Sequence, residues 1–175
     1  MRHLSSFNES FNRRRVPEVA ELLSSISDLS LDFKDEGFNT LFGVINSESN
    51  LPSGMPIFHE QLTDAHIRNI LILDCKICVL FDFKRPSRPN HQFLLNGLKD
   101  SQKEIVCNTI QSVADFIKSE SDLIRSLEYY YSILGEYRSG YRTETPYKCN
   151  LETSLSRIKS GSAIKIYLTF KIKDL

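Results

Sequence analysis

The chain has 175 residues, with 22 Lys and Arg, 22 Asp and Glu, and a hydrophobic fraction of 41%. This length can bury the core of one domain but is short for two. The zero formal net charge excludes a strong overall field, so a nucleic-acid or membrane partner would need a local basic patch. The sequence lacks the run of about 20 apolar residues that crosses a bilayer and the apolar run of a secretory signal. We therefore expect an intracellular, cytoplasmic protein whose cysteines are reduced.

The N-terminal segment, residues 1–15, shows no helical or strand period and ends in consecutive arginines. We predict that it is a mobile basic arm and that residues 16–175 form a single globular domain. Pro17 suits the first turn of a helix, and apolar residues then recur at helical spacing as far as Leu29. The sequence therefore predicts a first helix over residues 17–29.

The segment after this helix has a weaker pattern. Residues 29–33 (LSLDF) alternate and are compatible with a short strand, while residues 37–46 (GFNTLFGVIN) fit a helix or a strand. Residues 46–56 (NSESNLPSGMP) have the composition of a loop.

The most apolar segment runs from Leu71 to Phe83 and alternates with a period of two. Its odd positions are all apolar and its even positions include charged residues, so we predict a long strand with one buried face. Cys75 and Cys78 form a CxxC pair in it, but residues three apart on a strand point to opposite faces, so Cys75 would face the core. Zinc would need a second close pair of ligands, and a redox CxxC lies at a helix N-terminus. We interpret the cysteines as structural and expect no metal site.

Two helices are predicted after this strand. Ser101 and Glu104 match a capping box, and the apolar residues that follow lie on one helical face: Val106, Ile110, Val113 and Ile117. Ser121 can cap a further helix that ends near Gly135, with an apolar stripe made by Leu123, Leu127, Tyr130, Tyr131 and Leu134. Residues 137–150 have a loop-like composition.

The last strand is predicted over residues 162–173, where apolar residues again alternate with polar ones. Two long strands with one apolar face, with most of the helices between them in sequence, favour a sheet covered by helices on that face. We therefore predict a single two-layer α+β domain with a mainly antiparallel sheet, whose other face meets solvent or a partner. The sequence leaves the strand order open.

Basic residues are the main candidates for a binding function. We predict that phosphate groups of RNA or lipid are bound by Arg13, Arg14, Arg15, Lys84, Arg85, Arg88, Lys165, Lys171 and Lys173. If the two long strands are neighbours, the lysines would form one stripe, which Asp74 and Asp82 would partly neutralise. The alternative for the N-terminal arginines is a solvated tail without a binding role.

Other motifs carry less information. Residues 85–100 begin as an extended loop, and Pro86 to Pro89 within it matches a PxxP ligand. The tyrosines of residues 128–141 fit a stacking surface, although core packing is the more common use of such a stripe.

No motif for catalysis is present: the sequence lacks the phosphate-binding, dinucleotide, nucleophile-elbow and zinc-protease signatures. His59, Glu60, Asp64 and His66 lie close together in sequence, but a polar loop before a helix often contains such residues. We expect no catalytic residue, no cofactor and no small-molecule substrate.

The order of elements resembles one protein family. The elements are a basic N-terminus, a strand that ends in a basic Pro-containing loop (LFDFKRPSRP), a helix, an aromatic segment (YYYSILGEY) and a late alternating strand (IKIYLTFKIKD). Together they resemble the core of rhabdovirus matrix proteins, and the length resembles that of the plant-infecting members. The resemblance covers the chain from Ile70 to the end. The chain departs from the family in its weakly basic N-terminus, its zero net charge and its lack of a PPxY motif.

This resemblance implies a non-enzymatic structural protein that self-associates, condenses ribonucleoprotein and binds the inner face of the envelope, in the virion interior. In that family a basic N-terminal region makes these contacts, so Arg13, Arg14 and Arg15 are the positions that carry over. The expected partners are further copies of the chain, a nucleocapsid or RNA, and an anionic membrane surface. A small protein–protein adaptor and an RNA-binding regulator, each using the exposed sheet face and the basic arm, are the alternatives.

Overall fold

The computed structural model describes the whole chain except residues 1, 47–50, 52–55, 84–97, 139–140 and 174–175, and the side chains of residues 2–14 and 134–144 also lie outside the description. The expected loop of residues 46–56, most of the loop of residues 85–100 and the PxxP motif therefore fall largely or wholly outside the described residues.

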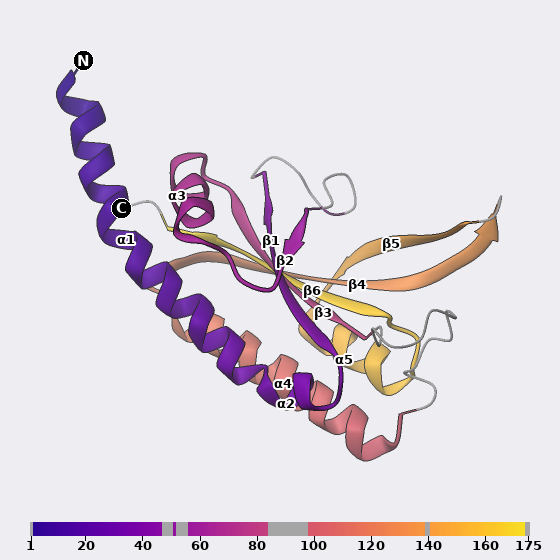
Figure 1. Cartoon of the computed structure of the whole chain (residues 1–175). Coiled ribbons are helices and arrows are strands. Elements are labelled where there is room, and N and C mark those ends of the chain that lie inside the picture. The colour runs from indigo at the N-terminus through magenta and orange to yellow at the C-terminus, as the bar shows by residue number, and fades with distance from the viewer. Residues whose placement is uncertain (1, 47–50, 52–55, 84–97, 139–140, 174–175) are drawn as a thin grey trace.

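A six-stranded sheet forms the centre of the fold, with the strand order β2-β1-β3-β6-β4-β5 (Figure 1). The strands are β1 (Asn39–Ile45), β2 (Phe58–His59), β3 (Lys76–Asp82), β4 (Ile124–Arg138), β5 (Tyr141–Cys149) and β6 (Lys165–Ile172). Every neighbouring pair is antiparallel. The predicted α+β class with an antiparallel sheet is confirmed.

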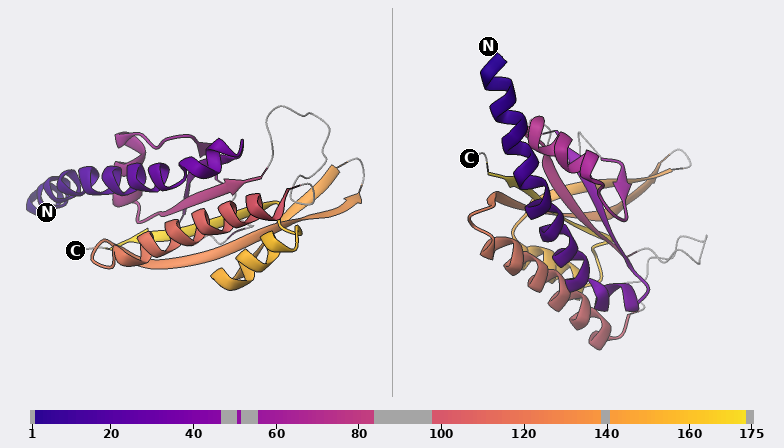
Figure 2. Two further views of the ribbon diagram at one scale, coloured as in Figure 1. Left: turned by 90° about the horizontal axis from the view of Figure 1, so that it is seen from below. Right: turned by 60° about the vertical axis from the view of Figure 1, so that its left-hand side comes forward.

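The helices pack on one face of this sheet and enclose the main core. They are α1 (Arg2–Leu29), α2 (Leu31–Asp35), α3 (Asp64–Ile72), α4 (Asp100–Ser119) and α5 (Leu151–Lys159). Each of them contributes buried apolar residues to one cluster, together with Ile77, Val79 and Phe81 of β3, which share one strand face. Seen from below, α4 crosses in front of the strands (Figure 2). The predicted two-layer arrangement is therefore confirmed.

The two strands with alternating sequences lie side by side at the centre of the sheet. β3 and β6 pair along their length, from Lys76 opposite Lys171 to Asp82 opposite Lys165. Ile77 and Phe170 are opposite each other and fully buried, and they face the helices. The alternating apolar residues of both strands therefore face the same core, as the sequence predicted.

The second face of the sheet is covered at its centre by residues of the same chain, which corrects the expectation that this face meets solvent or a partner. It carries a smaller buried cluster, made by Ile45, Leu51, Cys78, Leu80, Tyr130 and Tyr167. The ring of Phe58 packs against it, 6.3 Å from the ring of Tyr167. On this face Cys78 and Tyr167 lie between charged residues at the strand ends, so the sequence of these strands looks one-sided although the centres of both faces are buried.

The predicted strand from Leu71 to Phe83 is partly wrong, because its first residues belong to α3 and the turn that follows. Leu73 N–H donates to the Asn69 carbonyl at 2.9 Å, and Cys75 N–H donates to the Ile70 carbonyl at 3.0 Å, which is the pattern of a Schellman C-cap. The residue between them is Asp74, in the left-handed region at φ 52°. Glycine usually occupies this position, so the sequence lacked the usual signal for a helix end.

The first helix begins at Arg2 and not at Pro17, which lies inside α1. Leu4, Phe7 and Phe11 recur at helical spacing in the sequence, a signal that the sequence analysis missed. Pro17 has no N–H, so one helical hydrogen bond is missing close to where the buried part of α1 begins. The suggested strand at residues 29–33 is also wrong, because these residues lie at the end of α1 and in α2.

The C-terminal half contains the largest error of secondary structure. The segment predicted as a helix from Ser121 to Gly135 forms most of β4, and the predicted loop of residues 137–150 contains β5. Helix α5 was not predicted, although Asn150 is its N-cap and accepts a hydrogen bond from Thr153 N–H at 2.8 Å. The helix after Ser101 is confirmed as α4, but its N-cap is Lys99.

Gly43 on β1 gives a test of the cover over the second face. A Cβ atom at this position would lie 2.8 Å from Cγ of Pro56 and 3.1 Å from the ring of Phe58. We predict that Gly43→Ala lowers the free energy of unfolding in urea by about 1–3 kcal/mol, because it overpacks this contact. The double variant Gly43→Ala/Pro56→Ala should recover part of the loss. A single variant as stable as the wild type would contradict this packing.

Candidate functional site

Those predicted basic residues that the structure describes do not form one continuous stripe. Lys165 and Lys171 lie at opposite ends of β6, about 20 Å apart at the usual rise of a strand. Between them, Tyr167 and Thr169 are buried. The loop candidates Lys84, Arg85 and Arg88 lie outside the described residues. The basic candidates that the structure describes are thus separated into Lys165 at one end of β6 and a group at the other end.

This group lies where α1, the end of β6 and the turn between α3 and β3 meet (Figure 1). It contains Arg15, Lys171 and Lys173, together with Arg68 of α3. Lys171 forms an ion pair with Asp74 of the turn, whereas Arg68 and Lys173 are exposed. The sequence analysis did not select Arg68. It lies one helical turn before Ile72 on α3.

Arg15 has a structural role that the sequence did not reveal. It is only 8% exposed, and its Nη1 donates a hydrogen bond of 3.0 Å to the Lys173 carbonyl, which joins α1 to the end of β6. Its Nε lies 3.8 Å from a Glu18 carboxylate oxygen. It also lines a groove of about 570 Å³ whose other charged residues are acidic: Glu18, Glu21, Glu120 and Asp122. Burial and acidic surroundings disfavour phosphate binding at Arg15, but its assignment stays a prediction. The side chains of Arg13 and Arg14 are not described.

A polar network centred on Glu128 of β4 crosses the second face of the sheet. Lys76 Nζ donates to its carboxylate at 3.1 Å and Lys148 Nζ at 2.5 Å. Tyr130 and Thr169 donate their hydroxyl protons at 3.2 and 3.4 Å. Burial alone would raise the pKa of Glu128, but the hydrogen bonds from Lys148 and Lys76 outweigh it, and the pKa is lowered. Glu128 could not be predicted from the sequence, because three of these four partners come from other strands.

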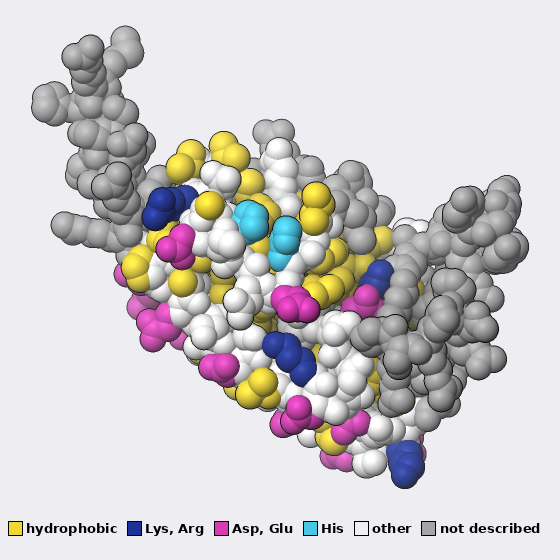
Figure 3. Space-filling model, in the orientation of Figure 1, with side chains coloured by type: hydrophobic (Ala, Val, Ile, Leu, Met, Phe, Trp, Pro, Cys, Tyr) yellow, Lys and Arg dark blue, Asp and Glu magenta, His cyan; other side chains and the backbone are white. Residues whose placement is uncertain are grey.

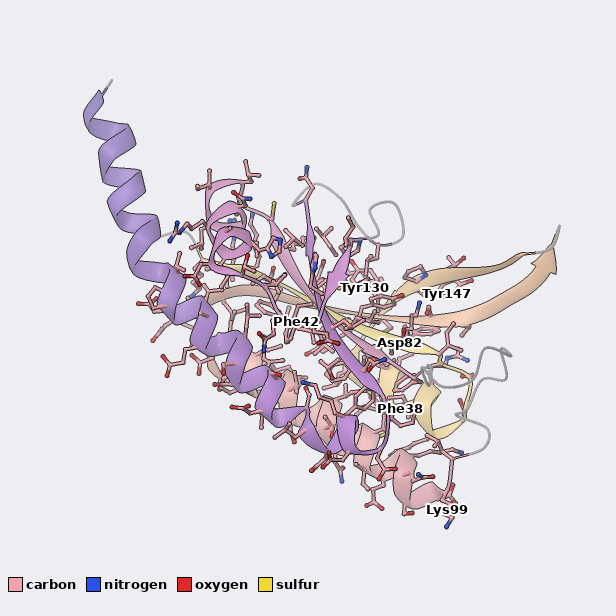
Figure 4. The ribbon with its side chains drawn as sticks, viewed as in Figure 1. Phe38, Phe42, Asp82, Lys99, Tyr130 and Tyr147 are labelled. Carbon is pink, nitrogen blue, oxygen red and sulfur yellow. The ribbon has the colours of Figure 1, made fainter. Side chains whose placement is uncertain are left out.

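Tyr130 completes this network at the centre of the sheet (Figure 4). Burial, followed by the charge of Glu128, raises the pKa of Tyr130 to about 12. The phenol therefore stays protonated and donates to the carboxylate at neutral pH. The network is an internal connection between strands, and its lysines have a partner within the chain.

His59 of β2 and His66 in the first turn of α3 stack on each other, with ring centroids 4.9 Å apart. His66 is part of a capping box in which Thr63 N–H donates to its Nδ1 at 3.2 Å. Among the described residues, no three His, Cys, Asp or Glu side chains are grouped closely enough to hold a metal ion. This polar segment thus begins a helix, which is the interpretation that the sequence analysis favoured.

The cysteines are unpaired thiols. Cys78 is fully buried in the second cluster and burial raises its pKa, whereas Cys75 lies before β3 and is partly exposed. The expectation that Cys75 faces the core from a strand is therefore wrong, although it packs against the edge of the main cluster.

The tyrosines of β4 and β5 alternate between the two faces of the sheet. Tyr131 and Tyr147 are cross-strand neighbours whose rings stack at 5.5 Å. The guanidinium of Arg157 lies 5.2 Å from the centre of the Tyr131 ring. Tyr147 is 44% exposed and lies on the edge strand (Figure 4). These rings form a small aromatic surface that depends on the pairing of β4 with β5 and would be absent from the predicted helix.

Comparison with protein-family models, with curated proteins and with solved structures finds no match to this chain. No helix in the described ranges is long and apolar enough to cross a membrane.

Arg15 gives a test of the contact between α1 and β6. We predict that Arg15→Ala lowers the free energy of unfolding by about 1–3 kcal/mol, because the Lys173 carbonyl loses its donor. The exposed Arg68→Ala serves as a matched control and should change stability by less than about 0.5 kcal/mol. Urea unfolding followed by circular dichroism measures both. Equal stabilities of the two variants would show that Arg15 does not hold β6.

The Glu128 network predicts a pH dependence of stability. Because its pKa in the folded chain lies below the usual 4.5, the unfolded chain takes up the proton first. Glu128 therefore stabilises the fold above about pH 4.5, and this contribution is lost as the pH falls through the folded-state pKa.

We expect Glu128→Gln to be less stable than the wild type at pH 7 and the difference to shrink toward pH 3. Glu152→Gln, at an exposed position of α5, is the control and should follow the wild-type profile. Urea midpoints between pH 7 and pH 3 provide the measurement. A constant difference for Glu128→Gln would contradict the proposed ionisation.

Proposed function

We propose that this protein is a non-enzymatic structural protein that self-associates and bridges ribonucleoprotein to an anionic membrane surface, as a viral matrix protein does. The observation that carries the proposal is that two elements extend past the folded body. These are the first half of α1 and the ribbon formed by β4 and β5 (Figure 2).

The ribbon extends because β4 is longer than its pairing with β6. That pairing ends at Ser132 opposite Lys165, whereas β4 continues to Arg138, about 20 Å further along the strand. In the part of the chain that the structure describes, only β5 pairs with this extension. A two-stranded ribbon is marginally stable in water by itself, so a further contact would stabilise it.

A further contact would also stabilise the first half of α1. Residues 2–14 precede the buried part of the helix and span about 20 Å at the rise of an α-helix. An isolated helix of this length is marginal in water. Its sequence contains Leu4, Phe7 and Phe11 at helical spacing, together with basic residues. A second copy of the chain is a partner that meets both requirements in a repeating assembly.

The edge of β5 limits how such an assembly can form. Ser132 accepts a hydrogen bond from Ile164 N–H at 2.9 Å, so its backbone groups point to β6. Pro146, which lies opposite Ser132, therefore has its nitrogen on the free edge, where it removes a donor. Simple addition of a strand along the whole edge is thus disfavoured, and the projecting ends are the better contacts.

RNA binding is a second candidate, which one observation favours. The exposed ring of Tyr147, stacked on Tyr131 beside Arg157, offers an aromatic surface next to a cation. Unpaired bases stack on such surfaces. Tyr147→Ala should weaken binding of single-stranded RNA if this candidate is right, with unchanged sedimentation of the protein alone.

Sedimentation velocity over a wide concentration series tests self-association. We predict that the wild-type protein forms oligomers that grow with concentration and that Phe7→Ser/Phe11→Ser suppresses them. Leu31→Ser, at a residue of α2 that is 52% exposed, is the matched control and should behave as the wild type. A wild-type protein that remains monomeric at all concentrations would overturn the proposal.

A further inference from the structure

The turn between α3 and β3 exposes two consecutive large apolar residues. Ile72 is 62% exposed and Leu73 is 65% exposed. Most of the described aliphatic side chains are buried, and single exposed ones are common on protein surfaces. An adjacent pair at a helix end is less common and keeps apolar surface in water.

This pair is held in a defined position. Its backbone belongs to the Schellman cap, with the hydrogen bonds of Leu73 and Cys75 back into α3. The ion pair between Asp74 and Lys171 ties the same turn to β6. The two apolar side chains therefore project from a fixed turn and need little ordering when they bind.

The charges around the pair are of both signs: the side chain of Asp74 is 44% exposed, whereas that of its partner Lys171 is 15% exposed. Arg68 lies on the same side of α3 as Ile72, one turn earlier, and is exposed. The acid of the turn, Asp74, is already paired with Lys171. Asp64 begins α3, about 12 Å away along the helix axis.

The acidic groove beside Arg15 lies on the other side of β6. It includes Leu123, which leads into β4, whereas the turn leads into β3. Figure 3 shows apolar side chains gathered at the upper part of the molecule, near the histidines, with a basic and an acidic side chain beside them. The turn therefore combines two apolar tips with the exposed cation of Arg68.

We propose that this turn is a membrane-insertion site, in which Ile72 and Leu73 enter the interfacial region of an anionic bilayer and Arg68 contacts lipid phosphates. Shallow insertion needs a few apolar tips with cations beside them. A stable dimer buries about 800 Å² on each partner, which is much more than two side chains provide. The inference rests on the proposed function for the presence of a membrane partner, and it specifies where that partner binds.

The absence of Trp from the sequence permits a direct test. Leu73→Trp introduces a single fluorophore at the turn, and Leu31→Trp places one at an exposed position on α2 as a matched control. With vesicles of phosphatidylcholine and phosphatidylserine, we expect a blue shift of emission for Leu73→Trp and none for Leu31→Trp. Vesicles of phosphatidylcholine alone should give a smaller shift.

Cosedimentation with the same vesicles gives the energetic test. Ile72→Ser/Leu73→Ser should weaken vesicle binding by about tenfold or more, because apolar contacts with the bilayer are lost. Leu31→Ser should bind as the wild type does. Arg68→Gln should weaken binding to the anionic vesicles and reduce its dependence on salt.

The outcomes separate this inference from the proposed function. Vesicle binding without a shift for Leu73→Trp, or with an unaffected Ile72→Ser/Leu73→Ser variant, would place the membrane contact elsewhere and overturn the inference alone. A wild-type protein that ignores vesicles overturns both the inference and the membrane-binding part of the proposed function. Loss of oligomers, without loss of vesicle binding, in Ile72→Ser/Leu73→Ser would assign the turn to a second copy. The proposed function fails separately, if the wild type does not self-associate.

Discussion

The antiparallel pairing of β3 with β6 is the constraint on which the rest of the structure depends. Both strands are central, and both bury side chains on each face. Ile77 and Phe170 face the helices, whereas Cys78 and Tyr167 face the second cluster. A shift of register by one residue would move each set to the opposite face and turn the charged residues at the strand ends toward the core. The pairing thereby also fixes which charged residues lie at each end of the sheet.

The sequence predicted this pair of strands because their alternation survives in both, and it predicted the faces correctly. The prediction was wrong at the start of β3, where apolar residues of α3 continue the same odd-numbered pattern. The helix ends at Ile72, and the turn that follows contains Asp74, whose left-handed backbone is more common for glycine. A periodic pattern alone does not separate a strand from a short buried helix that leads into it.

The helix predicted for the Tyr-rich segment was wrong for a different reason. Leu127, Tyr130 and Leu134 fit helical spacing, but Tyr129 and Tyr131 fit alternation equally well, and tyrosine favours strands. Pairing with β6, distant in sequence, decides between them. The candidate basic residues show the same limit, because consecutive arginines reveal nothing of their burial. The basic residues could be named from sequence, whereas the contact of Arg15 with Lys173 could not, because it is a tertiary one.

The positions of the projecting elements relate the two proposals to each other. The α3 turn lies at the Lys171 end of β6, and the ribbon begins at the Lys165 end, so a strand length of about 20 Å separates them. A molecule bound to a bilayer by its turn would direct the ribbon away from the lipid. The ribbon would then be free for a neighbouring copy or for ribonucleoprotein. Bridging requires this separation, because a single surface cannot contact a membrane and a second partner at once.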